Sequence, residues 1–283
     1  MMTMKRSIRI VFLAAISLLL VACGTANKTA KSGDAWKTYQ KEKTITLGFD
    51  NTFVPMGYKD ESGDNKGFDI DLAKAVFKQY GITVNFQAIN WDLKEAELKN
   101  GKIDMIWNGY SMTKERQAKV AFTIPYMKNE QVIVVKKSSG ITDTSDMKNK
   151  VLGAQSGSSG YDALTRHPKV LKDLVKDQDA TQYETFTQAF IDLKTNRIDG
   201  LLIDKVYANY YLKQENQLDD YQLVSTGFDN EQFAVGLRKE DKTLQKKINE
   251  ALKKMYQDGE FQAISQKWFG EDVATTQIQN KKR

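Results

Sequence analysis

The stretch TITLGFDNTFVPMGYKDESGDNKGFDIDLAKAVFKQYGITVNF (44–86) decides the fold, because a strand, a helix and a second strand follow one another within it. Apolar and polar residues alternate in 44–49 and in 82–86, which is typical of strands, whereas the apolar residues of 68–77 recur at helical spacing. We expect Asp69 to cap this helix and Gly81 to end it. The order predicts a parallel βαβ unit and places the chain in the α/β class.

The same alternation continues along the chain and then starts again near Lys150. Downstream of the opening stretch the pattern predicts a helix over 91–100 and a strand over 103–107. The second set comprises strands at 151–154 and 198–203 with helices after the loop 156–160, over 184–195 and from Lys205 onward. Buried strands are expected at 131–135 and 232–237, and amphipathic helices at 244–256 and 261–268. The sequence therefore predicts two α/β units.

The N-terminus has the pattern of a secretory signal peptide (1–22), with three cations before a short apolar run. The run is shorter than the roughly 20 residues that a membrane-spanning helix needs. The single cysteine, Cys23, stands where the cut would fall, and Leu20-Val21-Ala22-Cys23 resembles a bacterial lipobox. That resemblance implies a Cys23 lipidated with fatty acids such as palmitate, a linker over 24–43 and a lipid anchor on the outer face of the cell membrane, of Gram-positive type. A cut signal without lipid is the alternative.

Composition restricts the function classes. The net charge is +6, and the three cations of the signal account for half of it, which leaves a weak excess of +3 without a basic face for nucleic acid. His167 is the only histidine and Cys23 the only cysteine, so zinc sites, cysteine nucleophiles and Ser-His-Asp triads are disfavoured. We expect no metal and no cofactor, whereas Asp and Glu leave acid–base chemistry open.

Several local motifs, in one order, resemble the polar amino-acid-binding proteins of ABC importers, the bacterial extracellular solute-binding proteins of family 3. The likeness runs from about Thr44 to Glu271. It is carried by GFDNTFVP (48–55), GFDIDLA (67–73), WNGYSMTKER (107–116), AFTIPY (121–126), GSS (157–159), ID (203–204) and KWFG (267–270).

This resemblance implies a two-lobed periplasmic-binding-protein-like fold of type II, with an amino acid held between lobes that close over it. Lobe 1 would comprise 44–127 and 231–271, and lobe 2 would comprise 128–230. Hinge strands are expected at 126–131 and 228–233, and a polar tail at 272–283. The expected protein is a monomer that delivers its ligand to an ABC permease and its partner ATPase.

Arg116 is the candidate for the ligand's carboxylate, because a guanidinium offers a planar fork that stays charged when it is buried. It ends the family pattern Ser111-Met112-Thr113-Lys114-Glu115-Arg116, in which Thr113 is also a candidate helix cap. An exposed helical arginine is the plainer interpretation.

The loop 155–160 opens a helix, and its amides with Ser158 and Ser159 would meet the carboxylate from the other lobe. A plain turn is the alternative, and the missing Gly-Lys-Ser/Thr ending disfavours nucleotides.

Asp204, at a strand end, is the candidate for the ligand's ammonium, with a helix cap as the local alternative. Carbonyl groups near Asn108 and Gly109 would add acceptors. Phe53 and Trp91 match family positions that form the walls of the site, although core packing explains either ring as simply. The candidate ligand-binding residues are Asp50, Phe53, Trp91, Asn108, Gly109, Ser111, Arg116, Gln155, Ser158, Ser159 and Asp204.

Selectivity for the ligand's side chain is expected from Asp50, Asn51, Asn108, Gln155 and Glu231. Because Asn108 and Gln155 are neutral groups that both donate and accept, we expect a polar, uncharged ligand such as cystine, cysteine or glutamine. The chain is expected to be no enzyme. The alternatives are a dehydratase of cyclic acids on the same fold, with Asp50 or Glu231 as its acid or base, and a surface adhesin.

Overall fold

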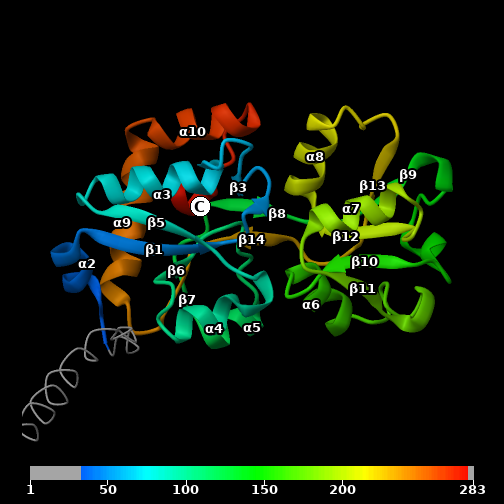
Figure 1. Ribbon diagram of the computed structural model, residues 1–283, viewed down its shortest axis with the longest axis horizontal. Helices are drawn as coiled ribbons and strands as arrows, with labels where there is room; N and C mark the ends of the chain where they lie inside the picture. The colour runs from blue at the N-terminus through cyan, green and yellow to red at the C-terminus, as the bar shows by residue number, and fades with distance from the viewer. Residues whose placement is uncertain (1–32, 280–283) are drawn as a thin grey trace, which may run out of the picture.

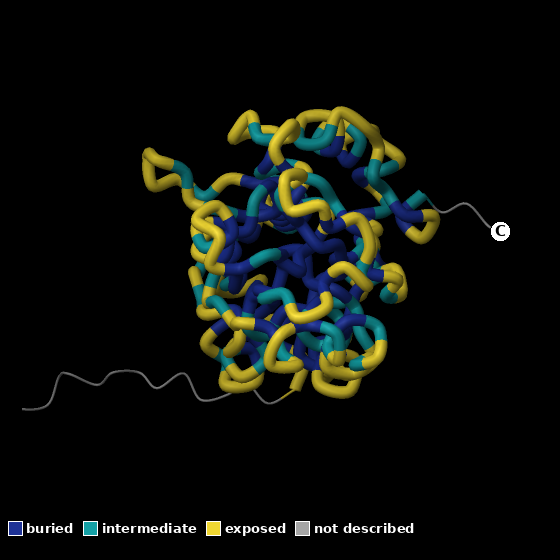
Figure 2. The backbone as a smooth tube through the Cα atoms, turned by 90° about the vertical axis from the view of Figure 1, so that its right-hand side faces the viewer, coloured by how far each residue is buried: buried dark blue, intermediate teal, exposed yellow. Residues whose placement is uncertain are grey.

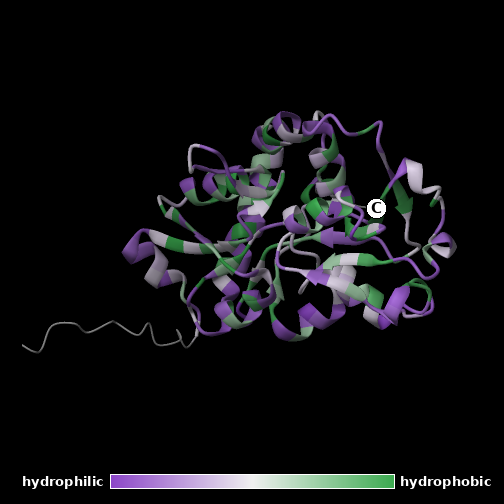
Figure 3. Cartoon of the chain, turned by 45° about the vertical axis from the view of Figure 1, so that its right-hand side comes forward, coloured by the Kyte–Doolittle hydropathy of each residue, from purple (hydrophilic) through white to green (hydrophobic). Residues whose placement is uncertain are grey.

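The computed structural model describes residues 33–279, and the predicted signal peptide and Cys23 lie outside the described residues. Two five-stranded sheets form two lobes that lie side by side (Figure 1). Buried backbone lies in the centre of the molecule and exposed turns at its edge (Figure 2). Hydrophobic colour appears on several strands of the sheets, whereas hydrophilic colour is common on the outer loops (Figure 3). The predicted α/β class and two-lobed fold are confirmed.

Lobe 1 is built on a sheet whose parallel strands come from the opening stretch of the sequence analysis. Strand β1 pairs in parallel with β5 and β6, and β15 runs antiparallel between β6 and β7. The strands, in spatial order, are β5 (Thr83–Ala88), β1 (Thr44–Phe49), β6 (Met105–Ile106), β15 (Gly236–Leu237) and β7 (Ala121–Phe122). A small antiparallel sheet of β2 (Thr52–Phe53), β3 (Gly57–Lys59) and β4 (Asn65–Lys66) follows β1.

Helices cover both faces of this sheet (Figure 1). The longest, α9, turns its apolar residues inward at helical spacing, and they are fully buried. The helices of lobe 1 are α2 (Trp36–Glu42), α3 (Phe68–Lys78), α4 (Lys94–Lys99) after the 3₁₀ turn η1 (Trp91–Leu93), α5 (Lys114–Lys119), α9 (Lys242–Gln257), α10 (Glu260–Phe269) and α11 (Thr276–Gln279).

Lobe 2 repeats this construction. Strand β10 is parallel to β11 and β12, and β9 lies antiparallel between β12 and β13. The strands, in spatial order, are β11 (Ala180–Tyr183), β10 (Leu152–Gln155), β12 (Gly200–Asp204), β9 (Gln131–Lys136) and β13 (Tyr221–Ser225). The helices are α6 (Ser159–Arg166), α7 (Phe186–Lys194) and α8 (Lys205–Gln214).

Two short antiparallel strands lie between the lobes, β8 (Met127–Asn129) and β14 (Glu231–Phe233). Both fall inside the segments in which hinge strands are expected. In their register Glu231 stands opposite Asn129. The chain passes from lobe 1 to lobe 2 along β8 and returns along β14 (Figure 1).

Three sequence expectations are wrong in detail. Asp69 does not cap α3, because Gly67 is the N-cap and Asp69 lies buried inside the first turn. Residues 36–42, expected as linker, form α2, whose buried Tyr39 donates a hydrogen bond to Asp104 at 2.9 Å. The expected polar tail contains α11, which buries Ile278 in the core of lobe 1.

Candidate functional site

The predicted site residues follow the carboxyl ends of parallel strands in both lobes, which is where open α/β sheets bind ligands. Eight of them enclose one small cavity of about 10 Å³ between the lobes. These eight are Phe53, Trp91, Gly109, Arg116, Gln155, Ser158, Ser159 and Asp204. The lobes are therefore closed on one another at the predicted site.

Arg116 lies buried at the lobe boundary and is not an exposed helical arginine. Its Nη1 donates to the carbonyl of Ser111 at 3.1 Å, and its Nη2 donates across the boundary to the carbonyl of Gly157 at 3.0 Å. The guanidinium carbon lies 4.7 Å from the centre of the Tyr110 ring. Thr113 caps α5 as predicted, accepting from the backbone amide of Arg116. These contacts fix the guanidinium where the two lobes meet.

Lys94 is a second buried cation at this place, and the sequence analysis missed it. Its Nζ donates to the carbonyl of Trp91 at 3.0 Å and to that of Gly157 at 2.8 Å. Burial lowers the pKa of Lys94 to about 8. Two cations of lobe 1 thus converge on one carbonyl of lobe 2. Gly157 has a φ of +68°, and a Cβ there would come within 3 Å of Asp92, so glycine permits this approach.

The serines of the loop 155–160 have different partners. Ser158 caps α6 by accepting from the amide of Tyr161 at 3.1 Å. Ser159 donates to Ser111 of lobe 1 at 3.1 Å and contacts the carboxylate of Glu231 at 3.0 Å. Ser111 and Ser159 are therefore brought together from opposite lobes.

Asp204 is buried at the end of β12, and its side chain makes no capping hydrogen bond to α8. Its Oδ1 accepts from Asn129 at 2.6 Å and from Gln131 at 2.9 Å. Burial, reinforced by the charge of Glu231, raises the pKa of Asp204 to about 7. The cap that was the local alternative is thus not formed. Glu231, expected to contribute to selectivity for the ligand's side chain, shares the side-chain donors of Asn129 and Gln131 with Asp204.

Asp50 occupies a separate buried position after β1. One carboxylate oxygen accepts from the amide and hydroxyl of Thr52, and the other accepts from Gln155 of lobe 2 at 2.7 Å. Burial raises the pKa of Asp50. Asn108 accepts from the amide of Asp50 at 3.0 Å. Asn51, also expected here, does not line the cavity.

Rings form one wall of the cavity. Phe53 packs against Tyr207 of lobe 2 with ring centres 5.5 Å apart, and Trp91 meets Tyr110 edge to face. Gly109 has a φ of +56°, and a Cβ there would come within 2.6 Å of the Phe53 ring. Glycine is therefore required where the chain turns after β6.

Asp69 holds this turn from behind, a role that the sequence analysis missed. Its Oδ2 accepts from the amide of Gly109 at 2.7 Å and from the hydroxyl of Tyr126 at 2.8 Å. Complete burial raises the pKa of Asp69 to about 7. Only the distance in sequence between Asp69 and Gly109 concealed the contact, since both belong to motifs of the predicted family.

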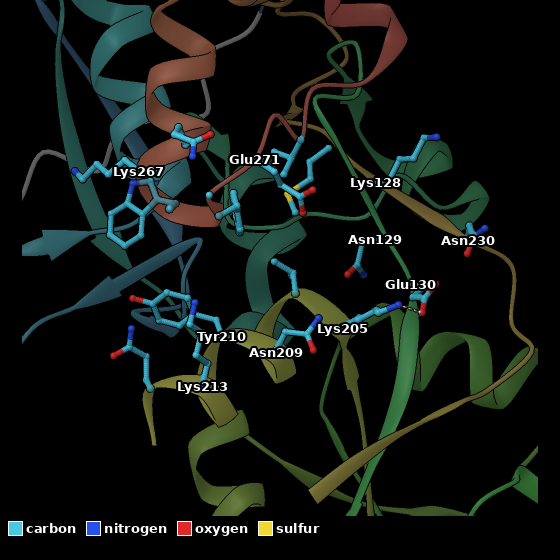
Figure 4. A pocket seen from close by; sticks show the side chains of 18 residues that line it. Lys128, Asn129, Glu130, Lys205, Asn209, Tyr210, Lys213, Asn230, Lys267 and Glu271 are labelled. Carbon is cyan, nitrogen blue, oxygen red and sulfur yellow. Dashed lines mark hydrogen bonds and ion pairs between the residues drawn. The ribbon is translucent and has the colours of Figure 1, made fainter. Parts of the chain in front are cut away.

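A larger hollow of about 790 Å³ lies outside the predicted site, between α8, β8 and the end of α10 (Figure 4). None of the candidate ligand-binding residues lines it. Lys205 and Glu130, which both line it, form an ion pair of 2.7 Å at one side of the hollow (Figure 4). The predicted site, in contrast, is filled by contacts between the lobes.

Within the part of the chain that the structure describes, no three His, Cys, Asp or Glu side chains are grouped so that they could hold a metal ion. None of the helices over 33–279 combines the length and the apolar character needed to cross a membrane.

Comparison with known proteins agrees with this geometry. Residues 45–271 match the bacterial extracellular solute-binding proteins, family 3. The chain is 29% identical to the L-cystine-binding protein TcyJ of Escherichia coli, over 92% of this chain and 96% of that protein. A substrate-binding protein of an ABC uptake transporter from Streptococcus pneumoniae, solved with bound histidine, is 64% identical. It superposes with a TM-score of 0.86 over 87% of this chain and all of that one. A polar amino acid ABC uptake transporter protein from Streptococcus thermophilus is 62% identical with a TM-score of 0.58, over 88% of this chain and 94% of that one.

Proposed function

Because the chain belongs to the bacterial extracellular solute-binding proteins of family 3, we propose that it captures one free amino acid between its lobes for an ABC importer. The observation that supports the proposal most directly is that Arg116 of lobe 1 and Asp204 of lobe 2 line the same enclosed space. A free amino acid is a zwitterion, and a water-excluding site must pair both of its charges because an unpaired buried charge is costly. Arg116 supplies the cation and Asp204 the anion.

Closure of the lobes supports the same function. The contacts of Arg116 and Lys94 with Gly157, and of Asp50 with Gln155, all join one lobe to the other. The two streptococcal proteins have nearly equal identity to this chain but unequal TM-scores. A lower TM-score at nearly the same sequence identity is expected when two lobes of unchanged fold are rotated relative to one another about a hinge.

The ligand's side chain would face Asp50 and Gln155. The sequence prediction of cystine, cysteine or glutamine remains a proposal, and it agrees with what the name of TcyJ says of that relative. Histidine is a second candidate, because a similar protein was solved with histidine bound and because Asp50 is a buried acceptor suited to an N–H donor.

The relatives reported above are binding proteins, which fits a chain that acts by binding rather than by catalysis. Anchoring through Cys23 and delivery to a permease belong to the proposal as well. Replacing Cys23 by Ser should release the protein from the membrane into the medium. A variant that stays in the detergent phase and remains acylated would disprove the lipobox.

Isothermal titration of refolded residues 24–283 with histidine, arginine, glutamine, cystine and cysteine tests the binding function. We expect one-to-one binding of one or a few of these with a Kd near 1 µM or below, about −8 kcal/mol. Absence of binding to any amino acid would refute the proposed function.

A further inference from the structure

One carboxylate oxygen at the hinge collects donors from both lobes. Oε2 of Glu231 accepts from Ser111 at 2.7 Å, Ser159 and Gln131 at 3.0 Å each, and Asn129 at 3.2 Å. Ser111 belongs to lobe 1, Ser159 to α6 of lobe 2, and Asn129 and Gln131 to the connection between them. Glu231 itself is carried by β14.

The same amide groups serve Asp204. The side-chain nitrogens of Asn129 and Gln131 each donate to Oδ1 of Asp204 and to Oε2 of Glu231. Both carboxylate oxygens lie within about 3 Å of the Gln131 nitrogen, so they are at most about 6 Å apart. The side-chain oxygens of Asn129 and Gln131 are buried without a hydrogen-bond partner among residues 33–279. Both amides thus turn their donors to the carboxylates and leave their own acceptors unpaired.

No cation of the described residues forms an ion pair with either carboxylate. The charge of Arg116 acts on Asp204, but its two terminal nitrogens donate to the carbonyls of Ser111 and Gly157. Lys205, next to Asp204 in sequence, points away and pairs with Glu130. Asp162, on α6, lies 3.9 Å from Arg116 and adds negative charge. The pair is therefore held by neutral donors alone, and the repulsion between the two carboxylates, which contributes to the raised pKa of Asp204, would be relieved by a cation placed beside them.

We propose that Glu231 and Asp204 together form the ammonium-binding site of this protein, with Glu231 as a specificity-determining residue carried by the hinge. This inference rests on the proposed function, since it takes the ligand to be an amino acid. The ligand's ammonium supplies the positive charge that the pair lacks. Because Glu231 also contacts Ser111 and Ser159, the group that recognises the ammonium is the group that joins hinge and lobes. Ligands without a charged amine leave the carboxylates unpaired and are rejected.

The test compares two ligands on one variant. The amino acid bound most tightly by the wild type is titrated beside the α-hydroxy acid with the same side chain, which lacks only the ammonium. Glu231→Gln keeps the shape of the side chain and an acceptor oxygen but removes the charge. Glu130→Gln, at a half-buried carboxylate of the same hinge connection that pairs with Lys205, is the matched control.

We expect Glu231→Gln to weaken binding of the amino acid at least tenfold and binding of the hydroxy acid less than threefold. The control should change neither. Equal weakening of both ligands would assign Glu231 a structural role, and an unchanged Kd for the amino acid would also overturn the proposal. If Glu231→Gln does not fold, Glu231→Asp decides, because it keeps the charge and should retain at least tenfold discrimination between the two ligands. A wild type that binds no amino acid would refute the proposed function instead.

Discussion

Replacing Arg116 by Ala should abolish amino-acid binding while the protein stays folded. The substitution removes the guanidinium that lies between Ser111 and Gly157. It also removes the cation stacked on the Tyr110 ring. Loss of the guanidinium between Ser111 and Gly157 weakens ligand binding and closure of the lobes. Loss of its contact with Tyr110 affects only the stability of lobe 1.

The magnitude follows from what the substitution leaves behind. A ligand carboxylate buried without its partner costs about 2–5 kcal/mol. A micromolar site has about −8 kcal/mol, so a loss near 4 kcal/mol leaves a millimolar one. The contribution to folding is smaller, since the contact between Arg116 and Tyr110 contributes about 0.5–2 kcal/mol.

Titration calorimetry at 25 °C measures the first effect, and thermal unfolding followed by circular dichroism measures the second. Lys114→Ala is the control, because Lys114 is an exposed cation in the first turn of the same helix. We expect the control to bind as the wild type does. A Kd for Arg116→Ala within threefold of the wild-type value, in a cooperatively folded protein, would refute the carboxylate assignment.

Three further substitutions test the fold and the site. Asp69→Asn should remove a pH dependence of stability: the pKa of about 7 lies above the ordinary 3.8, so the buried carboxyl stabilises the fold at low pH and loses this as pH rises through 7. Urea unfolding at pH 5 and pH 8 should show the variant gaining about 2–3 kcal/mol relative to wild type at the higher pH, because two pKa units separate pH 5 from the folded pKa of about 7, and parallel curves would contradict this. Ile278→Ala should cost about 2–4 kcal/mol because Ile278 is fully buried, and a change in the free energy of unfolding under 0.5 kcal/mol would restore the prediction of a polar tail without a packed side chain. Asp50→Asn should weaken binding of histidine and arginine at least tenfold more than that of glutamine, and equal effects in titration would place the ligand's side chain elsewhere.

Most of the fold was predictable because its strands are recognisable locally. Strand β1 was predicted with its bounds from its alternation of apolar and polar residues, and β9 and β10 nearly so, since each of these two is a short, mostly apolar run. Helices α2 and α11 were missed because they are short and polar apart from Trp36, Tyr39 and Ile278. Such segments are ordered by the cores on which they dock, and no periodicity within four to seven residues reveals that.

The site was predictable where a motif carried it and not where distant segments meet. Arg116 and Asp204 stand in family patterns, and the structure brings both to one cavity. Lys94 reaches Gly157 over 63 residues, and Glu231 reaches Ser111 over 120. Nothing near Lys94 distinguishes it from an exposed helical lysine, and nothing near Glu231 predicts its contacts with Ser111 and Ser159. Long-range contacts of this kind follow from topology rather than from local sequence.

The distribution of charge explains why an amino acid would favour closure. Lobe 1 contributes the cations Arg116 and Lys94, and the carboxylates of Asp204 and Glu231 come from lobe 2 and the hinge. A ligand that met only one group would bind open and closed forms alike and shift nothing. A zwitterion meets both groups only when the lobes are shut. Its higher affinity for the closed form than for the open form therefore shifts the equilibrium toward closure. Moving the equilibrium from 1:99 to 99:1 takes about 5.5 kcal/mol, which two charge-paired ends can supply within a binding free energy near −8 kcal/mol.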